Sequence, residues 1–202
     1  MSIDAILVGL GNPGPKYSLT RHNIGFILLD LLAQDKGTAF STSGLGKSIR
    51  AESCEVEIAG KKLLLLKPQT FMNLSGESLQ LLYQKQNHLR EVPLIVAHDE
   101  VDLAFKKLRI KFGGSDAGHN GLKSIRACLG HGDYNRLRLG VGRPLAEDKI
   151  SVADYVLANF AKPEQAELVN FLDHGIAVIE CLLKEGIAPA QALASKEQFT
   201  KV

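Results

Sequence analysis

The 202-residue chain is long enough for one compact domain, and its 45% apolar and 23% charged residues exclude a largely disordered protein. Its 24 basic and 22 acidic residues give a formal net charge of +2, which taken whole gives no sign of a nucleic-acid or membrane partner. The charges are segregated, however, because residues 103–143 hold nine basic and two acidic residues, whereas residues 145–202 hold five and nine.

The N-terminal third predicts strands and a helix in alternation. The apolar run at residues 5–10, closed by a Gly/Pro turn, predicts a buried strand. A single apolar stripe predicts a helix over residues 23–36, and Gly37 is placed to end it. Residues 49–58 and 62–67 flank a Gly-containing turn and predict a hairpin with a buried second strand.

The rest of the chain continues the alternation. Ser75 is expected to cap the next helix. A helix is predicted at residues 122–129, ended by Gly130, and Pro163 is expected to open a long C-terminal helix. Three short strands are predicted at residues 94–97, 108–112 and 137–141.

This pattern predicts the α/β class. We expect one domain over residues 1–202, with a twisted, mixed and largely parallel central sheet and helices on both of its faces. Residues 145–202 form its helical C-terminal part. Three glycines over the six residues 113–118 predict a mobile loop, and we expect residues 113–121 to act as a lid.

The sequence Gly9-Leu10-Gly11-Asn12-Pro13-Gly14 matches the G-x-G-x-x-G fingerprint of dinucleotide-binding sites, which suggests an oxidoreductase as one alternative. That fingerprint requires a helix to begin inside the motif, so that its amides meet the pyrophosphate. Here prolines flank the last glycine, and the helical stripe begins only near Asn23. We therefore interpret the motif as a rigid turn that presents Asn12 and the residues after it.

Polar residues follow several predicted strands, and sites in α/β sheets gather at the carboxyl ends of strands. His22 lies just past the glycine turn, at the entrance of a helix. The polar set comprises Asn12, His22, Asn73, Asp99, His119 and Asn120, with Phe71 and Met72 as a pocket floor. It contains a general base, a carboxylate that orients the base and amides that can hold a carbonyl, so it favours water-mediated acyl hydrolysis.

The segment His98-Asp99-Glu100-Val101-Asp102 also suggests a metal site. Neighbouring side chains of an extended segment point to opposite faces, however, and no second cluster with ligand spacing appears. A carboxylate that orients a catalytic histidine is the simpler interpretation, so we expect neither a metal nor another cofactor.

Six blocks of the sequence resemble the bacterial peptidyl-tRNA hydrolase family, in the family's order and over nearly the whole chain. The blocks are GLGNPGPKYSLTRHNIG (9–25), KPQTFMNLSG (67–76), HDEVDL (98–103), KFGGSDAGHNGLKSI (111–125), RLRLGVGRP (136–144) and DYVLANF (154–160).

The resemblance implies cleavage of the ester that joins a peptide, or an N-blocked amino acid, to the terminal ribose of tRNA. It implies that His22 activates water, that Asp99 holds the imidazole and that Asn12 contacts the peptide. The groups implied to bind the substrate's terminal nucleotide and carbonyl region are Tyr17, Phe71, Asn73 and Asn120, and His119 would belong to the lid. Met72, in the pocket floor, is also expected to contact the substrate. The other alternative is a relative that binds RNA but has no catalytic activity. Such a relative is expected to have lost one of His22, Asp99, Asn12 and Asn73, and all four are present.

Two departures from the family pattern bear on the lid and on RNA docking. The loop Gly113–Gly118 is commonly richer in glycine, and Ser115, Asp116 and Ala117 are expected either to stiffen it or to place a charge at its tip. Ala104 and Phe105 stand where the family commonly has Pro and Gly.

The basic stretch of residues 106–143 fits an RNA substrate. We select Lys111, Lys123 and Arg138 as contacts to the phosphate backbone; the other members are Lys106, Lys107, Arg109, Arg126, Arg136 and Arg143. The three widely spaced cysteines, the absence of a signal segment and the absence of a long apolar run predict a cytoplasmic protein with no membrane partner. We expect a monomer.

Overall fold

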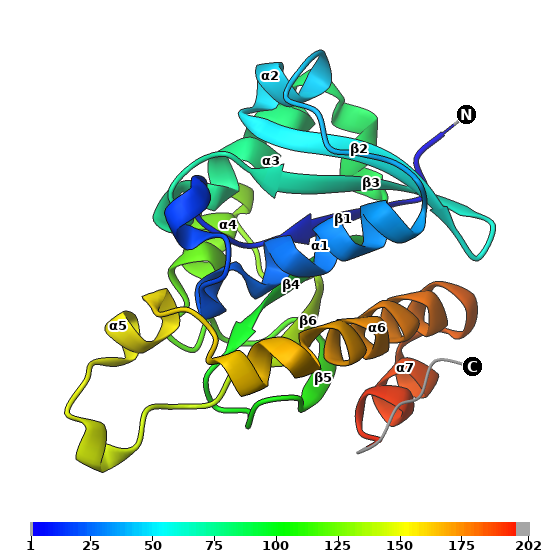
Figure 1. Ribbon diagram of the computed structural model, residues 1–202. Helices are drawn as coiled ribbons and strands as arrows, with labels where there is room; N and C mark the ends of the chain where they lie inside the picture. Colours follow the sequence, from blue (N-terminus) through cyan, green and yellow to red (C-terminus); the bar gives the residue numbers. More distant parts are fainter. Residues whose placement is uncertain (1, 197–202) are drawn as a thin grey trace.

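The computed structural model describes residues 2–196 and contains a six-stranded sheet (Figure 1). The strands are β1 (Ala5–Gly9), β2 (Ala51–Ile58), β3 (Lys61–Pro68), β4 (Leu94–Glu100), β5 (Leu108–Phe112) and β6 (Asn135–Gly140), in the spatial order β2-β3-β1-β4-β6-β5. The four inner strands are parallel, and β2 and β5 pair antiparallel at the two edges. The mixed, largely parallel sheet is thus confirmed.

The helices are α1 (Ile24–Asp35), α2 (Leu45–Ile49), α3 (Ser75–Lys85), α4 (Asn120–Leu129), α5 (Val152–Leu157), α6 (Lys162–Glu185) and α7 (Ile187–Ala194). Short 3₁₀ turns lie at Pro15–Tyr17, Arg21–Asn23, Met72–Leu74, Asn87–Glu91 and Ala146–Asp148. Within residues 2–196, no helix is both long and apolar enough to cross a membrane.

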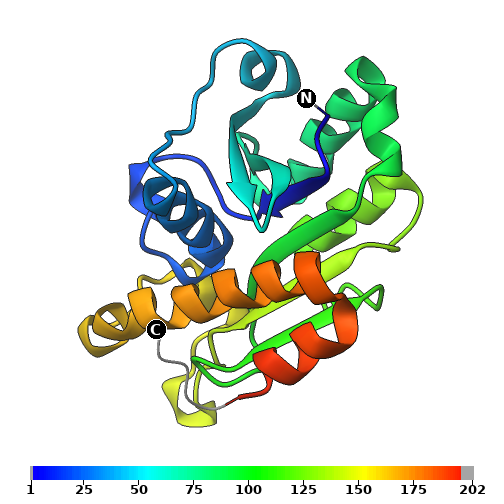
Figure 2. The ribbon, with the colours of Figure 1, turned by 90° about the vertical axis from the view of Figure 1, so that its right-hand side faces the viewer.

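The helices cover both faces of the sheet, as predicted (Figures 1 and 2). Side chains alternate along each strand, so Leu7 packs into one core with α1, α6 and α7, whereas Ile6 and Val8 pack into another with α3 and α4. Both cores are apolar, and the sheet lies between them.

Helix α1 lies unusually close to the sheet because Gly25 has no side chain. A Cβ atom there would lie 2.5 Å from the backbone nitrogen of Leu10 and 2.4 Å from the carbonyl oxygen of Ala97. This contact holds the 3₁₀ turn that precedes α1, and with it His22, beside the end of β4.

Two local predictions are wrong. Strand β4 continues beyond Ala97 to Glu100, because its last residues still pair with β6, where Asp99 faces Leu139. Ser75 lies inside α3 instead of capping it, and its hydroxyl donates to the carbonyl oxygen of Met72 in the preceding 3₁₀ turn.

The loop after β5 does not begin at the edge where the sequence pattern placed it. Because β5 runs antiparallel to β6, its carboxyl end at Phe112 lies opposite Asn135, the first residue of β6. Residues 113–118, the 113–118 loop, must therefore return along the sheet to bring His119 to the carboxyl end of β4. Positive φ angles at Gly113, Gly114, Ala117 and Gly118 accompany this path.

Candidate active site

A cleft of about 720 Å³ lies where β1, β3 and β4 end. It brings together eight of the residues selected from the sequence: Asn12, His22, Phe71, Met72, Asn73, Asp99, His119 and Asn120. Tyr17 does not belong to its lining. The parallel strands explain this convergence, because their carboxyl ends meet at one edge of the sheet.

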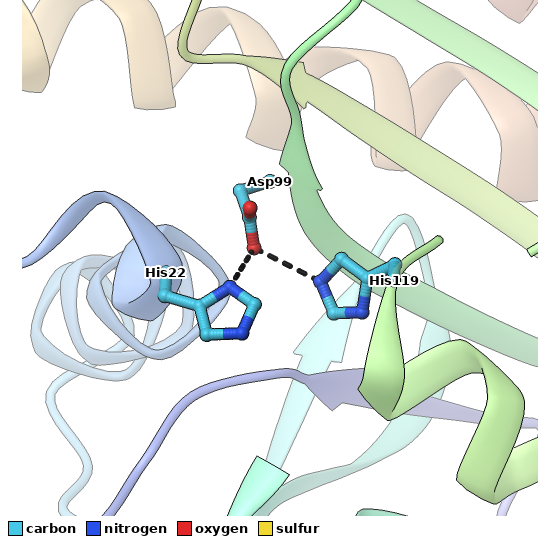
Figure 3. Close-up of side chains that lie close together, drawn as sticks. All are labelled: His22, Asp99 and His119. Atoms are coloured by element: carbon cyan, nitrogen blue, oxygen red, sulfur yellow. Dashed lines mark hydrogen bonds and ion pairs between the residues drawn. The ribbon is translucent and has the colours of Figure 1, made fainter. Parts of the chain in front are cut away.

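His22 and Asp99 form a hydrogen-bonded pair in the cleft (Figure 3). The Nδ1 atom of His22 lies 2.8 Å from Oδ1 of Asp99, and the His22 side chain is 12% exposed. A carboxylate only accepts, so Nδ1 carries a proton, and in the neutral imidazole Nε2 keeps its lone pair. Within residues 2–196, Nε2 of His22 has no partner, and it can accept a proton from a molecule in the cleft.

His119 approaches the same carboxylate oxygen from the other side (Figure 3). Its Nε2 atom lies 2.9 Å from Oδ1 of Asp99, and its ring centroid lies 5.0 Å from that of His22. Its Nδ1 atom accepts the backbone N–H groups of Gly121 and Leu122 and thereby caps α4. Nδ1 is therefore unprotonated, and Nε2 carries the proton donated to Asp99.

The donor atoms of His22, Asp99 and His119 lie within 4.8 Å of one another, close enough to share a metal ion. The hydrogen bonds of His119 oppose that use. Its Nδ1 lone pair is taken by the cap of α4, and its Nε2 atom carries a proton, so neither nitrogen has a lone pair for a metal. The geometry fits a hydrogen-bonded triad of side chains better than a metal centre.

The two imidazoles keep Asp99 ionised in a buried position. Burial alone raises the pKa of this carboxyl, but His119 and His22, with the hydrogen bonds they donate, outweigh burial and hold the pKa well below its usual range. The neighbouring His98 is fully buried on the opposite side of β4. Burial is the largest cause that lowers the pKa of His98, to about 3, so His98 stays neutral.

Asn12 is held rigidly by a residue that the sequence analysis did not select for a role. The side chain of Asn23 accepts the Asn12 N–H at 2.9 Å and donates to the Asn12 carbonyl at 2.9 Å. The Oδ1 atom of Asn12 accepts the N–H of Met72 at 2.8 Å, which leaves its NH₂ group to donate into the cleft. The position of Asn23 directly after His22 is the sequence feature that could have indicated this role.

The 3₁₀ turn that carries His22 is fixed by the buried Arg21. Its guanidinium donates to the carbonyl of Asn159 at 2.9 Å and pairs with Glu164 at 2.7 Å. It also lies over the ring of Tyr155 at 4.3 Å. The C-terminal helices thus help to position His22.

One wall of the cleft was not predicted. Val152, Val156 and Leu157 of α5 form an apolar surface, and Arg143 lies beside it, paired with Asp102 at 2.6 Å. No local pattern marks the three apolar residues as a cleft wall, because α5 reaches the cleft only by packing against the 3₁₀ turn of His22. On the opposite side, Phe71 is 61% exposed, and Asn73 and Asn120 are exposed as well.

The selected basic residues separate into two groups. Lys111 and Arg138 line a second, small cavity of about 70 Å³ beneath the 113–118 loop, where Arg138 also pairs with Glu100 at 2.8 Å. Lys123 lies exposed on α4 and lines neither cavity.

Two expectations for this region are wrong. Arg136 was counted with the phosphate-binding surface, but its side chain is 3% exposed because the 113–118 loop covers it. Of the two effects expected of the departure at Ser115, Asp116 and Ala117, stiffening of the loop or a charge at its tip, the second would require an exposed Asp116. Instead its side chain is 16% exposed and turns inward, between Arg126 and Arg136. A buried guanidinium requires a nearby anion, which explains both positions.

Comparison with known proteins gives a consistent assignment. The profile of the family described as Peptidyl-tRNA hydrolase matches residues 6–201. A peptidyl-tRNA hydrolase of Geotalea daltonii is 45% identical over 197 residues, covering 96% of this chain and 97% of its own, and one of a Mycobacterium species is 42% identical with the same coverage.

Solved structures agree with the sequence comparisons. The crystal structure of peptidyl-tRNA hydrolase from Acinetobacter baumannii superposes with a TM-score of 0.83, at 30% identity and with 98% of both chains covered. The family match spans almost the whole chain, and the two sequence relatives cover 96% of it. The chain therefore belongs to the peptidyl-tRNA hydrolase family.

Proposed function

We propose that this protein hydrolyses the ester bond between the peptide, or an N-blocked amino acid, and the terminal ribose of tRNA, with water activated by His22. The observation that carries the proposal is the 2.8 Å hydrogen bond between His22 and Asp99, which fixes the imidazole with Nε2 towards the cleft. Asp99 orients the ring and stabilises the imidazolium that forms, as in a Ser-His-Asp triad with water in place of serine.

The reaction conserves atoms and protons without an added cofactor. Nε2 of His22 removes a proton from water as the water oxygen attacks the ester carbonyl carbon. The bond between that carbon and the ribose oxygen then breaks, and the imidazolium returns the proton to the ribose oxygen. The products are a free carboxylic acid and tRNA with its terminal hydroxyl restored.

Asn12 is proposed to hold the peptide part of the substrate. Its free NH₂ group can donate to a carbonyl, and its position is fixed by Asn23 and Met72. A blocked amino acid offers such a carbonyl beyond the ester, whereas a free aminoacyl group offers an ammonium instead. This difference lets Asn12 favour the blocked substrate.

The terminal nucleotide is proposed to bind on the Phe71 side of the cleft. The exposed ring of Phe71 offers a surface for base stacking, and Asn73 and Asn120 offer amides at the cleft. Met72 forms the floor beneath them. Tyr17 stays a proposed contact that lies outside the cleft lining, with Lys16 over its ring at 4.7 Å.

Lys111, Lys123 and Arg138 are proposed to bind the phosphates of the acceptor stem, which proteins recognise mostly by shape and charge. Lys111 and Arg138 share the small cavity beneath the 113–118 loop, which supports one anionic group binding between them. The 113–118 loop, with His119 at its end, is proposed to act as the lid.

The proposal also covers the compartment, the oligomeric state and the need for a metal. We expect a cytoplasmic monomer that uses no metal. The three cysteines of the chain are unpaired, which suits a reducing compartment.

The test is hydrolysis of N-acetyl-aminoacyl-tRNA by the wild-type protein and by His22→Ala. We expect wild-type turnover and a loss of at least a hundredfold in kcat for the variant, about the size of effect seen when a general base is removed. Equal rates would exclude His22 as the base. Wild-type binding of tRNA without turnover would favour the catalytically silent relative, and stabilisation by NAD would favour the oxidoreductase.

A further inference from the structure

The 113–118 loop is fastened to the body of the protein at three consecutive residues. Arg126 of α4 donates to the carbonyl of Gly114 at 2.5 Å, and Arg136 of β6 donates to that of Ser115 at 2.6 Å. The carboxylate of Asp116 then lies between both guanidinium groups, 3.2 Å from Arg126 and 3.9 Å from Arg136. We call Asp116, Arg126 and Arg136 the loop clasp.

The buried guanidinium of Arg136 requires the negative charge of Asp116 beside it. The side chain of Arg136 is 3% exposed, and Asp116 is the carboxylate that lies within ion-pair distance of it among residues 2–196. Removing the partner of a buried charge is strongly unfavourable, so the carboxylate of Asp116 is tied to this place. Arg126, at 42% exposure, closes the pair from the outside.

The loop clasp connects to the catalytic side chains through one backbone contact. The carbonyl oxygen of Asp116 accepts the N–H of His119 at 2.7 Å. His119 in turn donates to Oδ1 of Asp99, the atom that also accepts from His22. Each contact fixes the next, from the two arginines to the catalytic base.

We propose that Asp116, held by Arg126 and Arg136, is a positioning residue that sets His119 against Asp99 and so tunes the His22–Asp99 pair. The inference rests on the proposed function, because it assumes that His22 is the base. Without the clasp, His119 loses its fixed approach to Asp99, and more of the carboxylate's negative charge acts on His22. That change favours the protonated imidazole, which is inactive as a base.

The test compares Asp116→Asn with Arg126→Gln in hydrolysis of N-acetyl-aminoacyl-tRNA across pH. The charged and titratable groups that line the cleft around His22 are Asp99, Glu100, Asp116, His119 and Arg143. The two variants remove opposite charges. Direct electrostatic effects on His22 would therefore move the acidic limb of the pH–rate profile in opposite directions in the two variants. Loss of positioning instead moves the acidic limb towards higher pH in both variants.

We expect kcat to fall about three- to tenfold in both variants, a typical coupling for residues in one network, with KM changed less than about twofold. Asp116→Glu, which keeps the charge, should restore the wild-type profile. Asp133→Asn and Arg90→Gln are matched controls, because they make the same chemical changes at exposed positions outside the cleft.

Unchanged profiles, limbs that move in opposite directions or an effect confined to KM would each overturn the positioning role. Thermal unfolding of each variant measures the fraction of folded protein at the assay temperature, and activity is expressed per folded protein. Should Asp116→Asn fail to fold, Arg126→Lys, which keeps the charge but loses the guanidinium contact to the carbonyl of Gly114, still separates the two effects. Loss of positioning moves its acidic limb towards higher pH, whereas a direct effect of charge leaves that limb unchanged. Loss of turnover in His22→Ala tests the proposed base independently, so failure of the clasp and failure of the proposed function give different results.

Discussion

At the scale of the residue, a single atom organises the candidate active site. Oδ1 of Asp99 accepts from His22 and from His119, and these two hydrogen bonds explain how a buried carboxylate stays ionised. The neighbouring His98 has the opposite fate, because burial removes its charge. Of two neighbouring side chains on β4, His98 is therefore buried without a charge, whereas Asp99 is buried with one.

The buried His98 predicts how stability depends on pH. Its pKa is about 3 in the folded protein against an ordinary 6.5, so between these values the unfolded chain binds a proton that the folded chain does not. The free energy of unfolding must therefore fall as pH falls through this window. In urea titrations, His98→Asn should remove about 1.4 kcal/mol of the loss measured between pH 7.5 and 5.5.

The matched control is His88→Asn, at an exposed histidine on the surface. It should keep the wild-type dependence on pH. An identical dependence in wild type and His98→Asn would show that His98 does not stay neutral in the fold.

At the scale of the element, parallel strands and one antiparallel edge determine which loops reach the cleft. The loops after β1, β3 and β4 arrive directly, because those strands end at the same edge. The 113–118 loop arrives only by returning along the sheet from the far end of β5. Helix α1 contributes by close packing against the sheet, and this packing can be tested separately from the chemistry.

Gly25→Ala should destabilise the protein by about 2–3 kcal/mol, the upper range for overpacking, because the new methyl group meets backbone atoms that cannot move aside. Urea unfolding at pH 7.5 measures this change. Gln34→Ala, at an exposed position of the same helix, should change stability by less than about 0.5 kcal/mol. Equal stabilities for Gly25→Ala and wild type would mean that α1 does not pack this closely.

At the scale of the whole molecule, the acidic C-terminal part is partly neutralised by the basic body. Glu164 pairs with Arg21, and Glu167 pairs with Lys106, both at 2.7 Å. Arg136 is buried, and Arg138 and Arg143 pair with acids, so the basic stretch presents fewer exposed charges than its composition indicates. Lys111 and Lys123 stay exposed on this side of the protein.

Lys111→Ala and Lys123→Ala should each weaken tRNA binding and reduce the slope of log K against log salt by about 1, as expected for one lost phosphate contact. The measurement is a salt titration of tRNA binding. Lys61→Ala removes an equally exposed lysine at the β2–β3 turn and should leave the slope unchanged. An unaltered slope in both test variants would mean that RNA docks on another surface.

The sequence by itself determined the sheet class, most of the elements and the chemical types in the cleft. Hydrophobic periodicity and turn residues act locally, so β1, the β2–β3 hairpin and α6 could be predicted from them. The choice of His22 with Asp99 was equally accessible, because both follow recognisable turns and strand ends, and the matching blocks are long.

Only the tertiary structure decided which atoms face one another. In the tertiary structure His119 is hydrogen-bonded to Asp99, and the side chain of Asn23 is hydrogen-bonded to the backbone of Asn12. Arg136 is buried, and the side chain of Asp116 points inward towards it. These outcomes depend on the direction of β5 and on contacts between residues distant in sequence, which no local pattern records. The net charge of +2 is likewise only a sum, and the surface that meets a substrate is determined by which charges the fold buries or pairs.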